Sequence, residues 1–124
     1  MEHLMSDLQK AMKAVRQVPG ITAVAIVRRD GIVIDHLLPK PVDARLVAAM
    51  TAAIVGTSEM ATEELYHGKF LQSIVESEKG KVISVGAGDE ALVVALVEPA
   101  TNLGLALMTI EKQAAKVGDI LAAC

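Results

Sequence analysis

The sequence predicts an α/β fold of the α+β kind, a three-layer α/β/α sandwich around a five-stranded, mostly antiparallel sheet. Its apolar patterns run in the order helix, two strands, helix, three strands, helix. Strands that follow one another without an intervening helix are separated by short turns, which join antiparallel neighbours. Several strands are apolar on both faces and need a layer of helices on each side of the sheet.

The chain is expected to begin with a helix and a β-hairpin. Residues 4–17 carry apolar side chains at helical spacing, and the pattern ends at Pro19. Two apolar strands, 21–27 and 32–38, flank an Asp-Gly pair that ends at Gly31. Asp-Gly between apolar runs is typical of a tight hairpin, because Gly adopts positive φ without strain.

The longest helical pattern covers residues 43–65. Asp43 is expected at or near its N-cap, where a short acidic side chain accepts hydrogen bonds from free backbone amides. Gly68 is expected to end the helix as a left-handed C-cap.

The second half of the chain is expected to form three strands and a helix. Polar and apolar residues mix in 69–77, which favours an edge or interface strand. Residues 81–85 form the return strand, and the strongly apolar run 91–97 is expected at the centre of the sheet. Residues 102–121 have apolar side chains at helical spacing.

Composition indicates one globular domain over residues 1–124 and excludes several functions. The net charge is −3, and Tyr66 and Phe70 are the only aromatic residues, which argues against nucleic acid as a ligand. Residues 46–58 contain no charge, but this run is shorter than the roughly 18 apolar residues of a membrane span. No signal peptide is evident at the N-terminus, so the expected location is the cytoplasm. Cys124 is the only cysteine, so no internal disulfide can form.

The titratable residues do not suggest catalysis. Asp35 and His36 are neighbours on a predicted strand and point to opposite faces. Glu63 and His67 are four residues apart on a helix, where a His near the C-terminus is favoured by the helix dipole. The three histidines come from distant elements without the spacing of metal ligands. We therefore expect a protein that is not an enzyme and has no catalytic residue, cofactor or metal.

The helix over 43–65 is apolar around more of its circumference than one core requires. A surface helix usually buries a stripe of about 100°, whereas apolar residues here cover more than half of the helical wheel. The excess predicts a second copy of the chain as packing partner. The residues expected at that dimer interface are small helix residues and the third strand: Thr51, Val55, Ser58, Thr62, Phe70, Leu71, Ser73 and Val75. The same helix residues could instead fit a tight contact between helix and sheet within one chain.

Three segments carry a family resemblance. The segments VPGITAVAIVRRDGIVID (18–35), AAMTAAIVGTSEMA (48–61) and ALVVALVEPATNLGLALM (91–108) resemble the Roadblock family, also called the dynein light chain Roadblock type. The resemblance implies a profilin-like fold and a dimer in which the third strands pair antiparallel and the second helices pack side by side. Family members serve as dynein accessory chains, as scaffolds for Rag-type GTPases and as activators of a bacterial Ras-like GTPase. The resemblance therefore implies a protein that holds or regulates a small GTPase without hydrolysing GTP itself.

We accordingly expect a homodimeric regulator or scaffold of a small Ras-like GTPase, and a heterodimer with a related chain stays open. The expected partner-binding residues lie on the outer side of the paired central helices: Arg45, Ala52, Gly56, Glu59 and Glu63. The charged members of this set could also be an ordinary solvated face. The alternatives are a small-ligand sensor domain and a structural dimerisation module without a GTPase partner.

Overall fold

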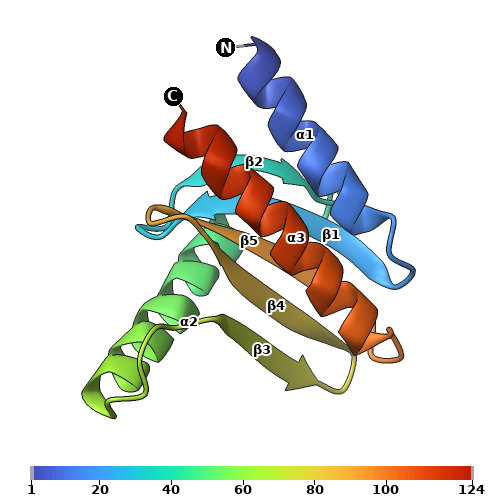
Figure 1. Ribbon diagram of the computed structural model, residues 1–124. Coiled ribbons are helices and arrows are strands. Elements are labelled where there is room, and N and C mark those ends of the chain that lie inside the picture. The colour runs from blue at the N-terminus through green and yellow to red at the C-terminus, as the bar shows by residue number, and fades with distance from the viewer. Residues whose placement is uncertain (1, 124) are drawn as a thin grey trace.

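The structure contains three helices and five strands in the order that the sequence predicts. A computed structural model describes residues 2–123 (Figure 1). Its elements are α1 (Glu2–Arg16), β1 (Ile21–Arg28), β2 (Val33–Leu37), α2 (Ala44–Glu64), β3 (Gln72–Ser77), β4 (Gly80–Ala87), β5 (Ala91–Val97) and α3 (Leu103–Ala122). Most bounds lie within two residues of the predicted ones. β3 begins three residues later than expected, because its pairing with β4 starts at Gln72 opposite Val85.

The five strands form one antiparallel sheet in the order β2-β1-β5-β4-β3. The predicted central strand is confirmed, since β5 lies between β1 and β4 and most of its side chains are fully buried. β2 and β3 are the edge strands. Both carry polar residues, as is usual for strands with one unpaired edge.

The sheet is covered on both faces, which confirms the three-layer architecture. α1 and α3 lie side by side on one face, and α2 crosses the opposite face (Figure 1). The larger core cluster includes Leu8, Met12 and Ile110 from the helices and Ile26 and Ile83 from the strands. The smaller cluster lies beneath α2. Its buried members are Ala25, Val27, Ala48, Val55, Leu92 and Val94.

α3 packs directly on the turn between β4 and β5. Gly88 in this turn has φ +70, and a Cβ atom added at Gly118 of α3 would lie 2.8 Å from the backbone nitrogen of Gly88. Real Cβ atoms do not approach backbone that closely, so the contact needs glycine at position 118. On the same face of the sheet, the side-chain amide of Gln9 in α1 donates to Asp35 of β2 at 2.8 Å. These contacts fix both helices to the sheet at points far apart in the sequence.

The ends of α2 confirm one cap and correct the other. The Asp43 carboxylate accepts hydrogen bonds from the amides of Arg45 and Leu46, as an N-cap does. At the C-terminal end, the left-handed residue that directly follows the cap is Tyr66, with φ 55, so the prediction of Gly68 for this role is wrong. Gly68 also has a positive φ but lies beyond the last turn of the helix.

Backbone hydrogen bonds explain why the helix ends before Tyr66. The Tyr66 amide donates to the Glu63 carbonyl at 3.1 Å, and the His67 amide donates to the Thr62 carbonyl at 2.8 Å. This pair of bonds is a Schellman motif, in which the residue after the cap adopts the left-handed conformation.

Among residues 2–123, no helix has the combination of length and apolar character that crossing a membrane requires.

Candidate interaction surface

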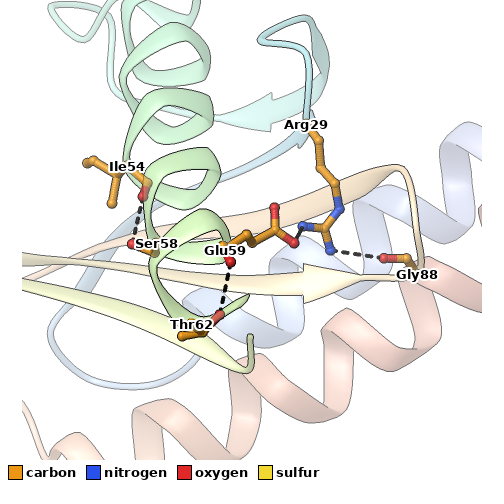
Figure 2. A network of polar contacts seen from close by, with 6 residues as sticks. All are labelled: Arg29, Ile54, Ser58, Glu59, Thr62 and Gly88. Atoms are coloured by element: carbon orange, nitrogen blue, oxygen red, sulfur yellow. Dashed lines mark hydrogen bonds and ion pairs between the residues drawn. The ribbon is translucent and has the colours of Figure 1, made fainter. Parts of the chain in front are cut away.

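α2 uses one face to contact its own sheet. The buried residues of this face are Ala48, Thr51 and Val55, and they recur at helical spacing over the strands. Ser58 and Thr62 continue the same face and are half-buried. Their hydroxyls donate to carbonyls of α2 itself, at 2.7 Å to Ile54 and 3.1 Å to Glu59 (Figure 2). This face therefore belongs to the interior of one protomer.

The position of Thr51 and Val55 differs from the expectation that they contact a second chain. Their side chains are only 2% and 1% exposed in the single protomer, so a partner cannot reach them in this structure. The physical reason is that apolar residues surround most of α2. A helical wheel then cannot tell which arc faces the protomer's own strands.

The opposite face of α2 is apolar and exposed. Leu46, Met50 and Met60 are 59%, 56% and 61% exposed, and Ala53 and Thr57 lie among them. We call the residues directed away from the sheet, Leu46, Ala53 and Met60, the outer face of α2. Monomeric proteins seldom expose several large apolar side chains on one helix face, so this surface is a candidate for contact with another protein.

One side of α2 is occupied within the protomer and the other is free. A Cβ atom added at Gly31, in the β1–β2 turn, would lie 3.7 Å from the Cβ of Ala52. Glu59 faces the same way, toward Arg29 of that turn. The other side, about 180° around the helix, carries the residues that we call the free side of α2: Met50, Ile54, Thr57 and Ala61.

The edge strand adds apolar residues to this surface. Leu71, directly before β3, is 76% exposed, and Val75 within β3 is 41% exposed. Phe70 packs beneath α2, and Ser73 is half-buried. Within the described part of the chain, β3 pairs with β4 alone, so its other edge presents unpaired backbone groups. Of the residues expected at a dimer interface, Leu71 and Val75 are thus accessible.

The structure exposes some of the expected partner-binding residues, whereas others are half-buried or already paired. Arg45, Gly56 and Glu63 are exposed, and a Cβ atom at Gly56 would have no neighbour within 4 Å. Ala52 is half-buried beside the β1–β2 turn. Glu59 is not a free carboxylate, because its Oε2 atom accepts a hydrogen bond from Arg29 Nη1 at 2.7 Å (Figure 2).

Arg29 also belongs to this region, although the sequence did not single it out. Its Nη2 atom donates to the Gly88 carbonyl at 3.2 Å (Figure 2). Its backbone amide donates to the Glu90 carbonyl. A Cβ atom at Gly86 would lie 2.9 Å from the same Nη2 atom, so Gly86 makes room for the guanidinium. Nothing in the local sequence distinguishes Arg29 from Arg28, whose side chain pairs with the exposed Asp30 instead.

The described residues of this surface form no arrangement that suggests a reaction. Asp35 and His36 diverge as expected: Asp35 contacts α1, whereas His36 is exposed. Among the described residues, no group of three or more His, Cys, Asp or Glu side chains is placed to hold a metal ion. The features of the site are instead apolar exposure, a free strand edge and a few charges at its border.

Together the fold and this surface define a small α/β/α domain with an apolar interaction surface on one helix and an edge strand. The profile of the Roadblock/LC7 domain family matches residues 7–96. Protein MJ1340 of Methanocaldococcus jannaschii is 36% identical over 110 residues, which cover 89% of this chain and 96% of that protein. The chain therefore belongs to the Roadblock/LC7 domain family.

Solved structures agree with this assignment at the level of the fold. The gliding protein MglB from Thermus thermophilus has a TM-score of 0.88 at 17% identity, covering 96% of this chain and 91% of that one. Profilin II of Acanthamoeba castellanii has a TM-score of 0.57 at 15% identity, covering 81% and 86%. The profilin-like architecture is thus confirmed.

Proposed function

We propose that this protein is a non-catalytic homodimer that regulates or scaffolds a small Ras-like GTPase. The observation that carries the proposal is the exposed apolar surface of α2, which lies beside a strand with a free edge. Membership of the Roadblock/LC7 family and the likeness to MglB support a regulatory role. The dimer and the GTPase are inferences that need separate tests.

The free side of α2 supports an antiparallel pairing of two copies. Along the helix its two long side chains, Met50 and Ile54, come before its two short ones, Thr57 and Ala61. If the two α2 helices run antiparallel about a twofold axis, Met50 of one copy faces Ala61 of the other, and Ile54 faces Thr57. A long side chain thus meets a short one at each position, which is the self-complementarity that a symmetric interface requires.

The free edge of β3 supports the same assembly. Two copies of β3 that pair antiparallel would satisfy the unpaired backbone groups of both edges and extend the sheet to both protomers. The α2 helices would then lie side by side on the same face of that sheet. This arrangement would bury Leu71 and Val75, two apolar side chains that the single protomer exposes.

The outer face of α2 remains accessible in such a dimer and is the proposed GTPase-binding platform. It combines apolar residues with Gly56, where a partner backbone can approach closely, and with the charged side chains of Arg45 and Glu63 at its border. Glu59 is less suited to direct contact, because Arg29 already holds its carboxylate. The nearby charges would act chiefly on the orientation and rate of association.

The first experiment tests the dimer by sedimentation equilibrium of the purified chain. The expected result is a mass twice that of the chain at micromolar concentration. A monomeric mass across the whole accessible concentration range would reject the dimer.

The second experiment measures binding of Ras-like GTPases from the same genome, each loaded with GDP or with a non-hydrolysable GTP analogue. We expect one GTPase to bind and the variant Glu63→Arg to weaken binding about tenfold, a loss of about 1.4 kcal/mol. Glu111→Arg is the matched control, because it makes the same charge change at an exposed position of α3. Equal losses for both variants, or no binding by any GTPase, would contradict the platform.

A further inference from the structure

Tyr66 combines two unusual properties. It is the only tyrosine of the chain, and its side chain is 94% exposed. It is also the only residue other than glycine with positive φ among residues 2–123, at 55°. Glycine or asparagine is the usual residue at this position of a Schellman motif, because a Cβ atom disfavours the left-handed conformation.

The surroundings of Tyr66 within the protomer do not explain why a tyrosine occupies this position. Its neighbour Leu65 is 63% exposed, and Leu71, at the start of β3, is 76% exposed. An aromatic side chain here therefore does not stabilise the protomer's own core. Exposed tyrosines with apolar neighbours are typical anchors of protein interfaces, because a large rigid ring loses little conformational entropy on binding.

A hollow of about 370 Å³ lies at the C-terminal end of β3, whereas Tyr66 precedes the N-terminal end of this strand. Its apolar members are Val97 and the pair Val82 and Leu96, which face each other across β4 and β5. Val82 adjoins the core cluster beneath α2. Ser77 at the end of β3, Lys79 in the following turn and Gly80 at the start of β4 also line it. The hollow therefore opens on the part of the α2 face of the sheet that α2 leaves uncovered.

Antiparallel pairing of two β3 strands brings these two features together. The start of one strand then lies beside the end of the other. Tyr66 precedes β3 by six residues, at the end of α2, which projects away from the sheet beside β3 in Figure 1. In the paired arrangement, the β3–β4 turn of the second copy would lie next to this point. Tyr66 and the hollow are separate in one protomer, but in such a dimer they would be adjacent across the twofold axis.

We infer that Tyr66 of each protomer occupies the hollow bordered by Val82, Leu96 and Lys79 in a second copy of the chain, and so anchors the dimer. The ring covers the apolar members of the hollow, and the Lys79 ammonium lies within reach of the ring face, where a cation is attracted. Two such contacts form by symmetry. This inference rests on the dimer of the proposed function and adds the residue that fixes its geometry.

The first test replaces Tyr66 with glycine. Tyr66→Gly removes the ring and relieves the backbone, so the variant is expected to fold with an unchanged circular dichroism spectrum. We expect its dimer dissociation constant to rise at least tenfold in sedimentation equilibrium. Tyr66→Phe keeps the ring and is expected to stay within threefold of the unchanged chain. Equal dissociation constants for Tyr66→Gly and the unchanged chain would overturn the inference.

The second test is a disulfide between protomers in a Cys124→Ser background. Tyr66→Cys combined with Lys79→Cys is expected to give a covalent dimer under mild oxidation that reducing agent reverses. Within one protomer the two positions lie at opposite ends of β3, roughly 17 Å or more apart, too far for a disulfide. Each single-cysteine variant is the control. A double variant that cross-links no better than the singles would contradict the contact.

These experiments separate failure of the inference from failure of the dimer. An unchanged chain that is monomeric would reject the dimer and the Tyr66 contact with it. A dimeric chain whose Tyr66→Gly variant dimerises equally well would reject the Tyr66 contact alone. If that variant stays dimeric but no longer binds the GTPase, Tyr66 serves the GTPase instead, and the inference is wrong.

Discussion

Arg29 Nη1 and Glu59 Oε2 lie 2.7 Å apart and join two elements separated by 30 residues of sequence (Figure 2). Arg29 comes from the β1–β2 turn, and Glu59 lies in the second turn from the end of α2. Because Arg29 also donates to the Gly88 carbonyl, one side chain links α2, the β1–β2 turn and the β4–β5 turn. The pair therefore holds the occupied side of α2 against the ends of the strands.

We predict that Glu59→Gln lowers the free energy of unfolding by about 0.5 to 1 kcal/mol. The estimate is modest because the two side chains are 25% and 40% exposed, and solvent screens such pairs. Urea denaturation of the single variants and of the double variant with Arg29→Gln measures the coupling. Asp30→Asn is the control, since its pair with Arg28 is more exposed and spans only two residues. A coupling energy no larger than that of the control pair would contradict the prediction.

Gly118→Ala is expected to destabilise the fold by about 1 to 3 kcal/mol, because the added Cβ meets the backbone of the β4–β5 turn rather than a movable side chain. Thermal and urea denaturation check this value. Gly104→Ala is the matched control in the same helix, where the nearest atom to a new Cβ is 3.6 Å away. If both variants change stability equally, the contact between α3 and the turn does not constrain position 118.

Two substitutions on α2 are expected to distinguish a residue that is needed for folding from one that is needed for dimerisation. Val55→Arg places a charge in the interior beneath α2 and is expected to cost more than about 3 kcal/mol, leaving little folded protein. Met50→Lys changes an exposed residue, so the protomer should lose less than about 0.5 kcal/mol while the proposed dimer dissociates. Circular dichroism and sedimentation equilibrium measure both effects. If the Met50→Lys variant remains a folded dimer, Met50 does not lie at the dimer interface.

Gly56→Ala is expected to stabilise the protomer by about 0.5 to 1 kcal/mol, because alanine favours a helix interior and no atom lies within 4 Å of the new Cβ. The same variant should weaken GTPase binding if a partner backbone approaches the outer face of α2 at this point. Urea denaturation and a binding titration give the two values. If the variant is more stable but binds the GTPase with unchanged affinity, the GTPase does not contact the outer face of α2 at Gly56.

The sequence was sufficient for the element order, the hairpins and the central strand. Each of these depends on residues close together in the chain, such as the unbroken apolar run of β5 or Gly31 between two strands. The polar mixture in β3 correctly indicated an edge strand. Local periodicity and turn chemistry are physical causes that act over a few residues, so a sequence pattern can express them.

By itself, the sequence thus determined the three layers, the edge position of β3 and the excess of apolar surface on α2. Only the tertiary structure decided that Val55 faces the protomer's own sheet, that Arg29 holds Glu59, and that Tyr66, not Gly68, is the left-handed residue directly after the cap of α2. An almost uniformly apolar helix has no preferred orientation until strands distant in the sequence pack against it. The orientation of α2, and therefore which of its side chains remain for a partner, follows from those long-range contacts.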